Sequence, residues 1–501
     1  MLLKNLCRGA GIKCPEDSEN TEINGISVSS DRVKNGDVFI CIDGLHTDSH
    51  QFARIACEKG AAAVVAKEGK TLDSLTVPVI RVKDCREAAA GLFASYYGNP
   101  QNSMKIIGIT GTNGKTTVGK MLYEILTKAS VRCGLIGTVE CLSPSGKIDI
   151  RSSNGLANMT TPDPEELYKI LSVMKEDGAE YVIMEVTSHA LALKKVSPIF
   201  FEYGIFTNLS EDHLDFHGNM EKYFEAKCKL FENCQTAVIN CDDYYGRRLC
   251  DRIKDAEVIR LSAEGRRADY YAGDIRYDGS RGIEYKIISR KLRLRIRCFI
   301  PGNFTVMNSF EAAVCAHEIG VRDGIISSAL LSMAGVSGRL EAVELGDGAD
   351  FSVFIDYAHT PDALENLLKT ARGFRKENQR IVLLFGCGGE RDRYKRKIMG
   401  QIASNLADFV IVTSDNSRSE ESSEIISEIM LGINKESCYT VIVNRKEAIE
   451  YAINNSESGD IILLAGKGHE AYEIDRNGKH PFSEKEIVRE AYEKKKRDYH
   501  C

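Results

Sequence analysis

Apolar residues along this chain follow two periods, and stretches of the two periods alternate. Short continuous apolar runs suit buried strands, as at 105–107, 181–186, 204–207 and 236–240. Between such runs, apolar residues recur three and four positions apart, as at 118–126, which is typical of helices packed on a sheet. The alternation predicts an α/β fold with a mostly parallel sheet and crossover helices.

The pattern also divides the chain into three predicted domains, because 501 residues exceed what one hydrophobic core usually serves. Residues 1–101 form a small α/β unit that ends at the break of 97–100. Residues 102–338 hold the alternating segment, and 339–501 bring three more apolar runs.

Two local patterns refine this division. Residues 283–299 alternate charged and apolar side chains, which predicts an antiparallel edge of the central sheet. Residues 335–338, Gly-Val-Ser-Gly, are a predicted hinge before the last domain.

Composition and charge narrow the function. A net charge of -6 gives no reason to expect a nucleic acid or an anionic membrane as partner. No run approaches the roughly 18 apolar residues of a membrane span, and the start lacks a signal-peptide core, so we expect a cytoplasmic protein without membrane insertion. Sixteen cysteines without any Cys-x-x-Cys pair suit free thiols rather than a zinc site.

Residues 108–117, Gly-Ile-Thr-Gly-Thr-Asn-Gly-Lys-Thr-Thr, predict a phosphate-binding loop between a strand and a helix. Backbone N–H groups of 111–115 and the helix N-terminus would hold polyphosphate. Lys115 adds a positive charge, and Thr116 offers a hydroxyl to Mg²⁺. The strict pattern has glycine where this chain has Ile109, so the loop is a variant.

Carboxylates and histidines gather at other strand ends. Glu185 ends the run 181–186 and could reach a magnesium ion at the phosphate loop, although a polar strand end is the simpler reading. Two histidines and three carboxylates follow within 211–218, which suggests a metal or catalytic site, with His217 either functional or structural. Asp356 ends another apolar run, before a turn fixed by Pro361.

Together these segments resemble the Mur ligases, an ATP-dependent amide-forming family that extends the peptide of the cell-wall precursor. The matching motifs lie in family order at 111–117, 185–189, 208–215, 303–313, 338–341 and 356–361. The resemblance implies three domains: a small UDP-binding domain, a central ATPase-type parallel sheet and a C-terminal Rossmann-like domain. It implies ATP binding by Gly111, Thr112, Asn113, Gly114, Lys115, Thr116, Thr117, Asn303, Asn308, Arg339 and Asp356.

Within the family, the chain is most similar to the MurE branch, which adds the third residue to UDP-MurNAc-L-Ala-D-Glu. The branch's segments are matched at 160–162 and 223–231. The resemblance implies catalysis by Lys115, Glu185, His213 and Lys227, with Lys227 carbamylated, and Mg²⁺ ligation by Thr116, Glu185, His213 and Lys227. The UDP-substrate would bind Ser30, Thr160, Thr161, Ser188 and Lys195, although the sequence departs from the usual pattern at 29–31 and at Lys195.

The last domain would hold the incoming amino acid. The resemblance assigns this role to Arg391, Asp415, Asn416, Arg418, Gly466 and Glu470. Arg418 could pair with the distal carboxylate of meso-diaminopimelate, and Glu470 with its distal ammonium. Ser417 stands where proline is usual.

The resemblance therefore implies a monomeric ligase that uses ATP and Mg²⁺ and passes through an acyl phosphate. Its substrates would be UDP-MurNAc-L-Ala-D-Glu and a diamino acid. Four alternatives remain open: use of L-lysine or another amino acid, a specialised paralogue, a folylpolyglutamate or cyanophycin-type ligase, and a non-catalytic nucleotide-binding module.

Overall fold

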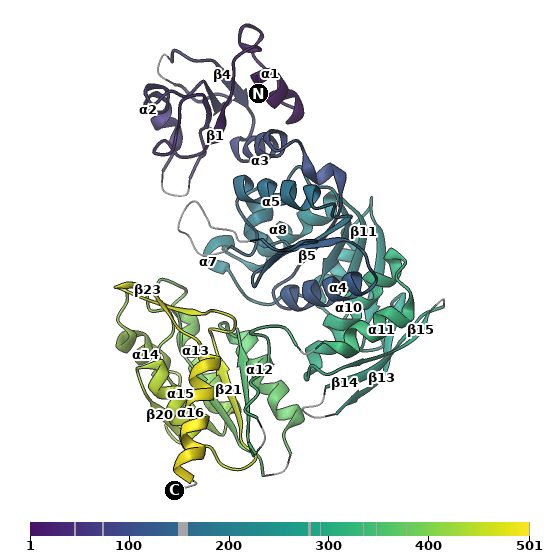
Figure 1. The fold of residues 1–501 in the computed structure, drawn as a ribbon, viewed down its shortest axis with the longest axis vertical. Coiled ribbons are helices and arrows are strands. Elements are labelled where there is room, and N and C mark those ends of the chain that lie inside the picture. Colours follow the sequence, from purple (N-terminus) through teal and green to yellow (C-terminus); the bar gives the residue numbers. More distant parts are fainter. Residues whose placement is uncertain are drawn as a thin grey trace.

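The computed structural model describes residues 1–44, 47–72, 75–148, 159–278, 282–290, 292–333, 335–346, 348–376 and 378–499. Three α/β units follow one another along the long axis, with the N-terminus in the first and the C-terminus in the last (Figure 1). Their three main sheets span 25–82, 105–298 and 341–465, within the three predicted segments.

The first unit is a four-stranded parallel sheet with the order β1-β2-β3-β4. Its strands are β1 (Gly25–Ser27), β2 (Asp37–Ile40), β3 (Ala63–Lys67) and β4 (Val79–Val82). Its helices are α1 (Leu3–Gly9), α2 (Ala53–Glu58) and α3 (Cys85–Tyr96), with short 3-10 turns at Glu16–Ser18 and Ser49–Phe52. Alternation along β2 places Val38 against α1 and α3, and Phe39 against α2.

The central unit has an eleven-stranded sheet with the order β15-β14-β13-β12-β11-β10-β5-β9-β6-β7-β8. Its strands are β5 (Lys105–Thr110), β6 (Cys133–Ile136), β7 (Cys141–Ser143), β8 (Gly146–Lys147), β9 (Tyr181–Glu185), β10 (Phe201–Phe206), β11 (Cys234–Asn240), β12 (Glu257–Ser262), β13 (Tyr270–Tyr277), β14 (Ile283–Ile288) and β15 (Arg293–Cys298). In this order, neighbouring strands from β13 through β5 to β6 pair in parallel. Strands β7 and β8 pair antiparallel at one edge of the sheet. The predicted antiparallel edge is confirmed, because β13, β14 and β15 pair antiparallel.

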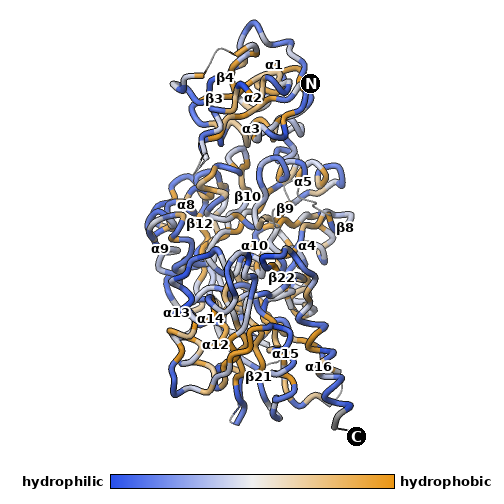
Figure 2. The backbone as a smooth tube through the Cα atoms, turned by 90° about the vertical axis from the view of Figure 1, so that its left-hand side faces the viewer, coloured by the Kyte–Doolittle hydropathy of each residue, from blue (hydrophilic) through white to orange (hydrophobic). Residues whose placement is uncertain are grey.

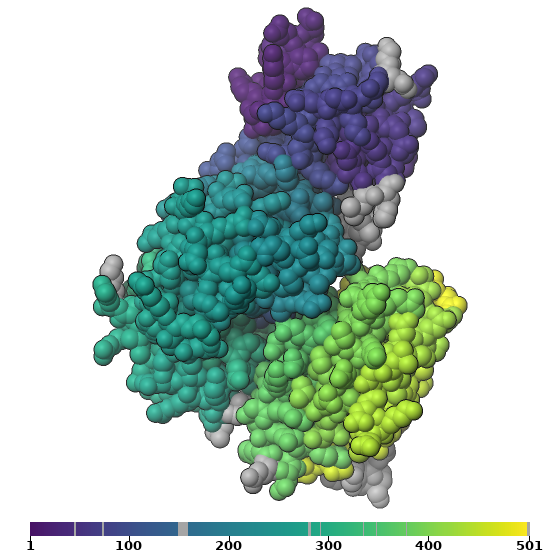
Figure 3. Space-filling view, turned by 180° about the vertical axis from the view of Figure 1, so that it is seen from behind, coloured from purple at the N-terminus to yellow at the C-terminus, as the bar shows by residue number. Residues whose placement is uncertain are grey.

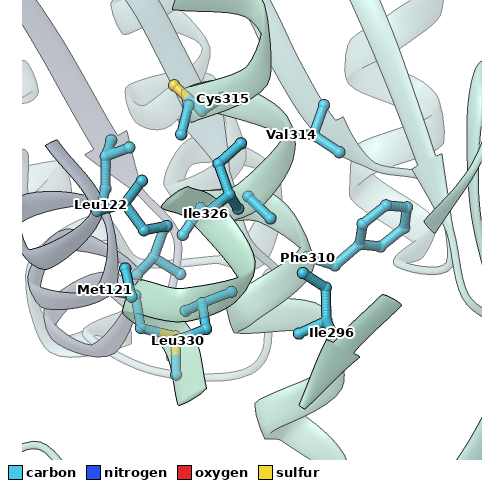
Figure 4. Close-up of a cluster of buried hydrophobic side chains, with 14 of the residues drawn as sticks. Met121, Leu122, Ile296, Phe310, Val314, Cys315, Ile326 and Leu330 are labelled. Atoms are coloured by element: carbon cyan, nitrogen blue, oxygen red, sulfur yellow. The ribbon is translucent and has the colours of Figure 1, made fainter. Parts of the chain in front are cut away.

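Helices cover both faces of this sheet. They are α4 (Lys115–Lys128), α5 (Pro164–Glu176), α6 (Ser188–Ala192), α7 (Leu214–His217), α8 (Met220–Glu232), α9 (Tyr244–Arg252), α10 (Asn303–Ile319) and α11 (Asp323–Ser332), after the 3-10 turn Pro100–Ser103. Alternation along β5 directs Ile107 toward α4 and α10, and Ile106 toward α5 and α8. Figure 4 shows Phe310 and Val314 of α10 with Leu122 of α4 and Ile326 of α11 in one apolar cluster, which fixes α4 behind its loop.

The last unit is a six-stranded sheet with the order β16-β17-β21-β18-β19-β20, parallel except for β16. Its strands are β16 (Glu341–Ala342), β17 (Ser352–Asp356), β18 (Ile381–Phe385), β19 (Phe409–Val412), β20 (Tyr439–Val441) and β21 (Ile461–Ala465), and β22 (Tyr472–Asp475) and β23 (Gly478–Pro481) form a separate hairpin. Its helices are α12 (Pro361–Phe374), α13 (Tyr394–Leu406), α14 (Ser422–Met430), α15 (Arg445–Asn454) and α16 (Glu484–Tyr499).

A backbone tube coloured by hydropathy and a space-filling view show where the apolar positions lie and how two of the units meet. Apolar positions concentrate along the strands inside each unit, most plainly at β21 (Figure 2). Figure 3 shows a notch where the central unit faces the last one.

No helix in the described ranges is both long and apolar enough to cross a membrane.

Candidate active site

The phosphate loop is a strand-to-helix turn that only glycine can make at two points. Gly111 has φ +150°, and a Cβ there would lie 1.9 Å from Thr207 Oγ1. Gly114, which precedes α4, has φ +89°, and its Cβ would lie 2.6 Å from Asn308 Oδ1. A side chain at either position would clash and strain the backbone, so the loop's glycines follow from its close packing.

The end of β10 holds this loop in place. Asn208 accepts from Thr112 N at its carbonyl (2.9 Å) and from Asn113 N at its side-chain oxygen (3.0 Å). Thr207 Oγ1 donates to the Asn113 carbonyl at 2.6 Å. Thr117 is buried one turn into α4. The loop and the segment after β10 are therefore one hydrogen-bonded unit.

Two lysines converge on one carbonyl of the loop. Lys115 Nζ donates to the Gly111 oxygen at 2.9 Å, and Lys227 Nζ of α8 donates to the same oxygen at 2.8 Å. Lys227 is 1% exposed, with its Nζ 4.6 Å from the centre of the Tyr223 ring. Burial, and then the charge of Lys115, hold the pKa of Lys227 well below its usual range.

Glu185 lies at the end of β9 with three donors around its carboxylate. Thr116 Oγ1 donates to Oε2 at 2.9 Å, as Thr138 Oγ1 does at 3.0 Å, and Thr138 N donates to Oε1 at 2.9 Å. The sequence analysis missed Thr138, although it closely follows the apolar strand β6, where polar residues of a parallel sheet gather.

His213 lies in the segment after β10 with a left-handed backbone, φ 54°. Its ring packs 4.8 Å from that of His189, centre to centre, and its Nε2 lies 3.4 Å from Asp212 Oδ2. Burial lowers the pKa of His213, and the charges of Lys115 and Lys227 act in the same direction. The imidazole is therefore favoured in its neutral form, which is the form that can ligate a metal.

Three of the five predicted UDP-substrate residues, Thr160, Thr161 and Ser188, gather at the end of β9. Thr161 Oγ1 donates to the Glu185 carbonyl at 2.9 Å, and Thr160 Oγ1 lies 3.0 Å from Thr138 Oγ1. Ser188 Oγ lies 2.9 Å from His217 Nε2, which gives His217 a supporting role.

The other two UDP-substrate residues lie apart from this group of hydroxyls. Lys195 Nζ pairs with Asp163 Oδ1 at 2.7 Å. Ser30 lies in the first unit, where its carbonyl accepts from Lys59 Nζ at 3.0 Å.

The last unit faces this site through Arg339 and Asp356. Arg339 Nη2 donates to Thr116 Oγ1 at 3.4 Å, and its guanidinium lies 5.0 Å from the centre of the Tyr357 ring. Asp356 accepts from Leu340 N at 2.7 Å, and burial raises its pKa. Asn308 is buried against Gly114, whereas Asn303 is exposed at the start of α10, so Asn308 and Arg339 reach the loop from two different units.

Asp362, which the sequence analysis did not select, joins the two units directly. Its Oδ2 accepts from Asn113 Nδ2 at 2.6 Å and from Ser210 Oγ at 2.8 Å, across 249 and 152 residues of sequence. It lies in the first turn of α12, whose cap is Thr360. The predicted hinge residue Gly338 also packs closely, since a Cβ there would lie 2.2 Å from His469 N.

We expect Asp362→Ala to lower kcat/KM about ten- to a hundredfold, because Asp362 holds the last unit against the loop and losing one hydrogen bond to a charged group costs about 1.5–3 kcal/mol. Steady-state kinetics with ATP varied would measure the loss. Glu365→Ala is the matched control, since Glu365 lies one turn further along α12 and pairs there with Lys369. Equal rates for the two variants would contradict a role for Asp362 in closure.

The predicted amino-acid residues lie at the ends of β19 and β21. Asn416 Nδ2 donates to Glu470 Oε2 at 2.7 Å, and Lys467 Nζ donates to Asn416 Oδ1 at 2.9 Å. Asp415 packs behind Gly466, where a Cβ would lie 2.5 Å from Oδ2. Burial, and then Asp415, raise the pKa of Glu470.

Arg418 and Arg391 come from neighbouring loops. Arg418 has φ 54°, and its Nη1 donates to the Gly389 carbonyl at 2.6 Å. A Cβ on Gly388 would lie 3.1 Å from Arg418 Nη1 and 3.8 Å from Arg391 Cγ, so both arginines flank that glycine. A hollow of about 460 Å³ opens beside Arg418 and Ile474.

Family models match all three units. The Mur ligase family catalytic domain matches residues 22–97, the Mur ligase middle domain 109–316, and the Mur ligase glutamate ligase domain 338–468. The chain therefore belongs to the Mur ligase family, and it is a ligase.

Relatives and solved structures agree with this assignment. A Clostridium perfringens protein named UDP-N-acetylmuramoyl-L-alanyl-D-glutamate–2,6-diaminopimelate ligase is 39% identical over 99% of this chain and 100% of its own. A Clostridioides difficile protein of the same name is 40% identical over 99% and 100%.

Among solved structures, one titled as a UDP-N-acetylmuramoyl-L-alanyl-D-glutamate–2,6-diaminopimelate ligase aligns with TM-score 0.68 and 28% identity over 99% of this chain and 100% of its own. The MurF ligase of Thermotoga maritima in complex with ADP aligns with TM-score 0.60 and 20% identity over 96% and 99%, which shows the shared fold.

Proposed function

We propose that this protein joins meso-diaminopimelate to the D-Glu carboxyl of UDP-MurNAc-L-Ala-D-Glu at the expense of ATP. One observation carries the proposal: the phosphate loop and the group of Asn416, Arg418 and Glu470 follow the carboxyl ends of strands in two units that Asp362 joins. Relatives named for this reaction, similar over nearly the whole chain, support it.

The reaction has two chemical steps. The D-Glu carboxylate attacks the γ-phosphorus of ATP, an O–P bond forms, and ADP leaves with the electrons of the broken bond. The amine of the incoming amino acid then attacks the acyl carbon, loses a proton, and releases inorganic phosphate. The loop N–H groups and Lys115 would stabilise the charge on the transferring phosphoryl group.

A magnesium ion suits the oxygen donors present at the loop. Thr116 Oγ1 and the Glu185 carboxylate lie 2.9 Å apart, with His213 in the segment that holds the loop. Hydroxyl and carboxylate oxygens are ligands that Mg²⁺ prefers. We infer that Thr116, Glu185, His213 and Lys227 would hold the metal, which when bound neutralises charge on the phosphates.

Lys227 fits this metal role only after modification. A buried lysine with a lowered pKa presents a neutral amine, which can attack CO₂. The new N–C bond gives a carbamate, and one proton leaves to solvent. The carbamate oxygens supply the anionic ligand that an ammonium group cannot.

The UDP-substrate would span the first and central units. Thr160, Thr161 and Ser188 lie around the end of β9, beside Glu185, and Lys195 pairs with Asp163 apart from them. Ser30 would contact the nucleotide end from the first unit. We expect the protein to act as a monomer in the cytoplasm.

A purified-enzyme assay tests the proposal. ATP hydrolysis to ADP and phosphate is followed with UDP-MurNAc-L-Ala-D-Glu and each of meso-diaminopimelate, L-lysine and L-ornithine. Turnover that needs both the nucleotide dipeptide and diaminopimelate supports it. Turnover with folate or cyanophycin-type acceptors, or ATP binding without turnover, would overturn it.

Arg418 should set a preference for meso-diaminopimelate over L-lysine. L-Lysine brings only an ammonium, which the guanidinium repels, whereas diaminopimelate can satisfy Arg418 and Glu470 together. Losing one charge-assisted pair costs about 1.5–3 kcal/mol, so the ratio of kcat/KM values should be roughly ten- to a hundredfold and should narrow in Arg418→Ala. A wild type that uses L-lysine equally well would contradict the specificity but not the ligase chemistry.

A further inference from the structure

The two loops that carry Arg391 and Arg418 are bonded to each other along their length. Gly389 N donates to the Asn416 carbonyl at 2.9 Å, and Arg418 Nη1 donates back to the Gly389 carbonyl at 2.6 Å. Ser419 Oγ donates to Glu390. The position of the Arg418 guanidinium therefore depends on where the Arg391 loop lies.

An ion pair with a fully buried arginine lies behind this junction. Arg396 of α13 is 0% exposed and donates to Glu420 through both terminal nitrogens, each at 2.9 Å. The same guanidinium donates to the Gly388 carbonyl at 3.2 Å and to Glu428 at 2.8 Å. Glu420 in turn accepts from Glu390 N at 2.5 Å. Arg396 and Glu420 thus each bind the Arg391 loop, and Glu420 belongs to the Arg418 loop.

The Arg418 loop needs such a restraint. Arg418 adopts φ 54°, a left-handed conformation that costs a residue with a side chain and persists only where its surroundings impose it. Ser417, just before it, leaves the backbone freer than proline would. Arg418 N is held by the Ile474 carbonyl at 3.1 Å.

Stability alone does not explain why a charged side chain is buried here. Arg396 is fully buried while Glu420 is 20% exposed, and the desolvation cost of a buried charge is often as large as the attraction to its partner. The Arg396 guanidinium lowers the pKa of Glu420 to about 2, which keeps the carboxylate ionised at any pH where the enzyme works. What this pair supplies is a fixed geometry between two loops.

We propose that Arg396 and Glu420 are positioning residues for the diamino acid: their ion pair locks the Arg391 and Arg418 loops together and holds the Arg418 guanidinium where the distal carboxylate binds. This inference rests on the proposed function, because it assumes that Arg418 binds the distal carboxylate of the diamino acid. Neither residue touches substrate, so their effect should pass through Arg418.

Glu420→Gln is the first test, because it keeps the size of the side chain while removing its charge and one of its two acceptor oxygens. We expect KM for meso-diaminopimelate to rise about tenfold and its advantage over L-lysine to shrink, which matches the loss of one charge-assisted bond. KM for ATP and for the nucleotide dipeptide should stay within about twofold, which a general loss of folding would not produce.

A double-mutant cycle shows whether the effect passes through Arg418. If it does, Glu420→Gln combined with Arg418→Ala should bind diaminopimelate no more weakly than Arg418→Ala alone. Fully additive losses would overturn the positioning role. Arg396→Lys, which keeps the charge but cannot bind Glu420 through two nitrogens, should behave as Glu420→Gln does.

Asp460→Asn is the matched control. Asp460 is 2% exposed and pairs with Arg380 through two bonds of 3.0 and 2.8 Å, at the start of β21 rather than at its pocket end. Asp460→Asn should lower the melting temperature without changing the ratio of kcat/KM for meso-diaminopimelate to kcat/KM for L-lysine. If Asp460→Asn and Glu420→Gln had the same ratio of kcat/KM for the two amino acids, the inference would be refuted. A wild-type enzyme that is inactive with diaminopimelate would refute the proposed function instead.

Discussion

Replacing Lys227 with alanine should reduce ligation by roughly a hundredfold or more, the scale of loss when a group that stabilises transition-state charge is removed. The side chain is 1% exposed and shares the Gly111 carbonyl with Lys115. Two ammonium groups on one carbonyl would repel each other and a metal ion. Converting Lys227 to a carbamate removes that repulsion and adds an anionic oxygen.

The control for this variant lies on the same helix. Lys229 is exposed two residues further along α8, and Lys229→Ala should retain activity. Adding short carboxylates to Lys227→Ala should restore some turnover by supplying the missing oxygen ligand. Near-normal turnover of Lys227→Ala without additives would refute the assignment.

The pH dependence of the modification has a definite sign. Carbamate formation needs the neutral amine, and the lowered pKa of Lys227 makes that form available at lower pH than for an exposed lysine. Occupancy should therefore fall as the pH drops through this lowered pKa, and rise with added bicarbonate. ¹³C NMR of enzyme equilibrated with labelled bicarbonate would show a carbamate carbon in the wild type and none in Lys227→Ala.

The sequence predicted the residues at strand ends better than the contacts between units. The loop 108–117 and Glu185 each follow an apolar run, so periodicity places them at one edge of a sheet. The pairing of Thr116 with Glu185 at 2.9 Å follows from the parallel pairing of β5 with β9.

Contacts between side chains that are far apart in the sequence leave no comparable pattern in the sequence. Asp362 lies in a first helical turn, where an acidic residue is already favoured by the helix dipole, so nothing marked it as a partner of Asn113. Arg396 lies in a helix with charged neighbours, and its complete burial depends on Glu420 and Glu428 from another segment. Burial of charge is a tertiary property that no local pattern reveals.

Lys115→Ala should abolish phosphoryl transfer while leaving the nucleotide dipeptide bound. Lys115 is the one loop side chain that carries a positive charge, and its removal should lower kcat by about 10²–10³-fold, as when one stabilising group for a developing anion is lost. Phosphate release in a single turnover would measure it. Lys120→Ala, which breaks ion pairs with Glu124 of α4 and with Glu140 just before β7, is the control.

Binding measurements on the same variant test the division of labour between the units. Three predicted contacts of the nucleotide dipeptide lie around β9, Lys195 pairs with Asp163, and Ser30 lies in the first unit, so none depends on the Lys115 side chain. Calorimetry should therefore give a Kd for UDP-MurNAc-L-Ala-D-Glu within about threefold of wild type, or less than about 0.7 kcal/mol. If Lys115→Ala lost dipeptide binding as severely as phosphoryl transfer, the two substrates would share the loop, and the separate UDP site would be wrong.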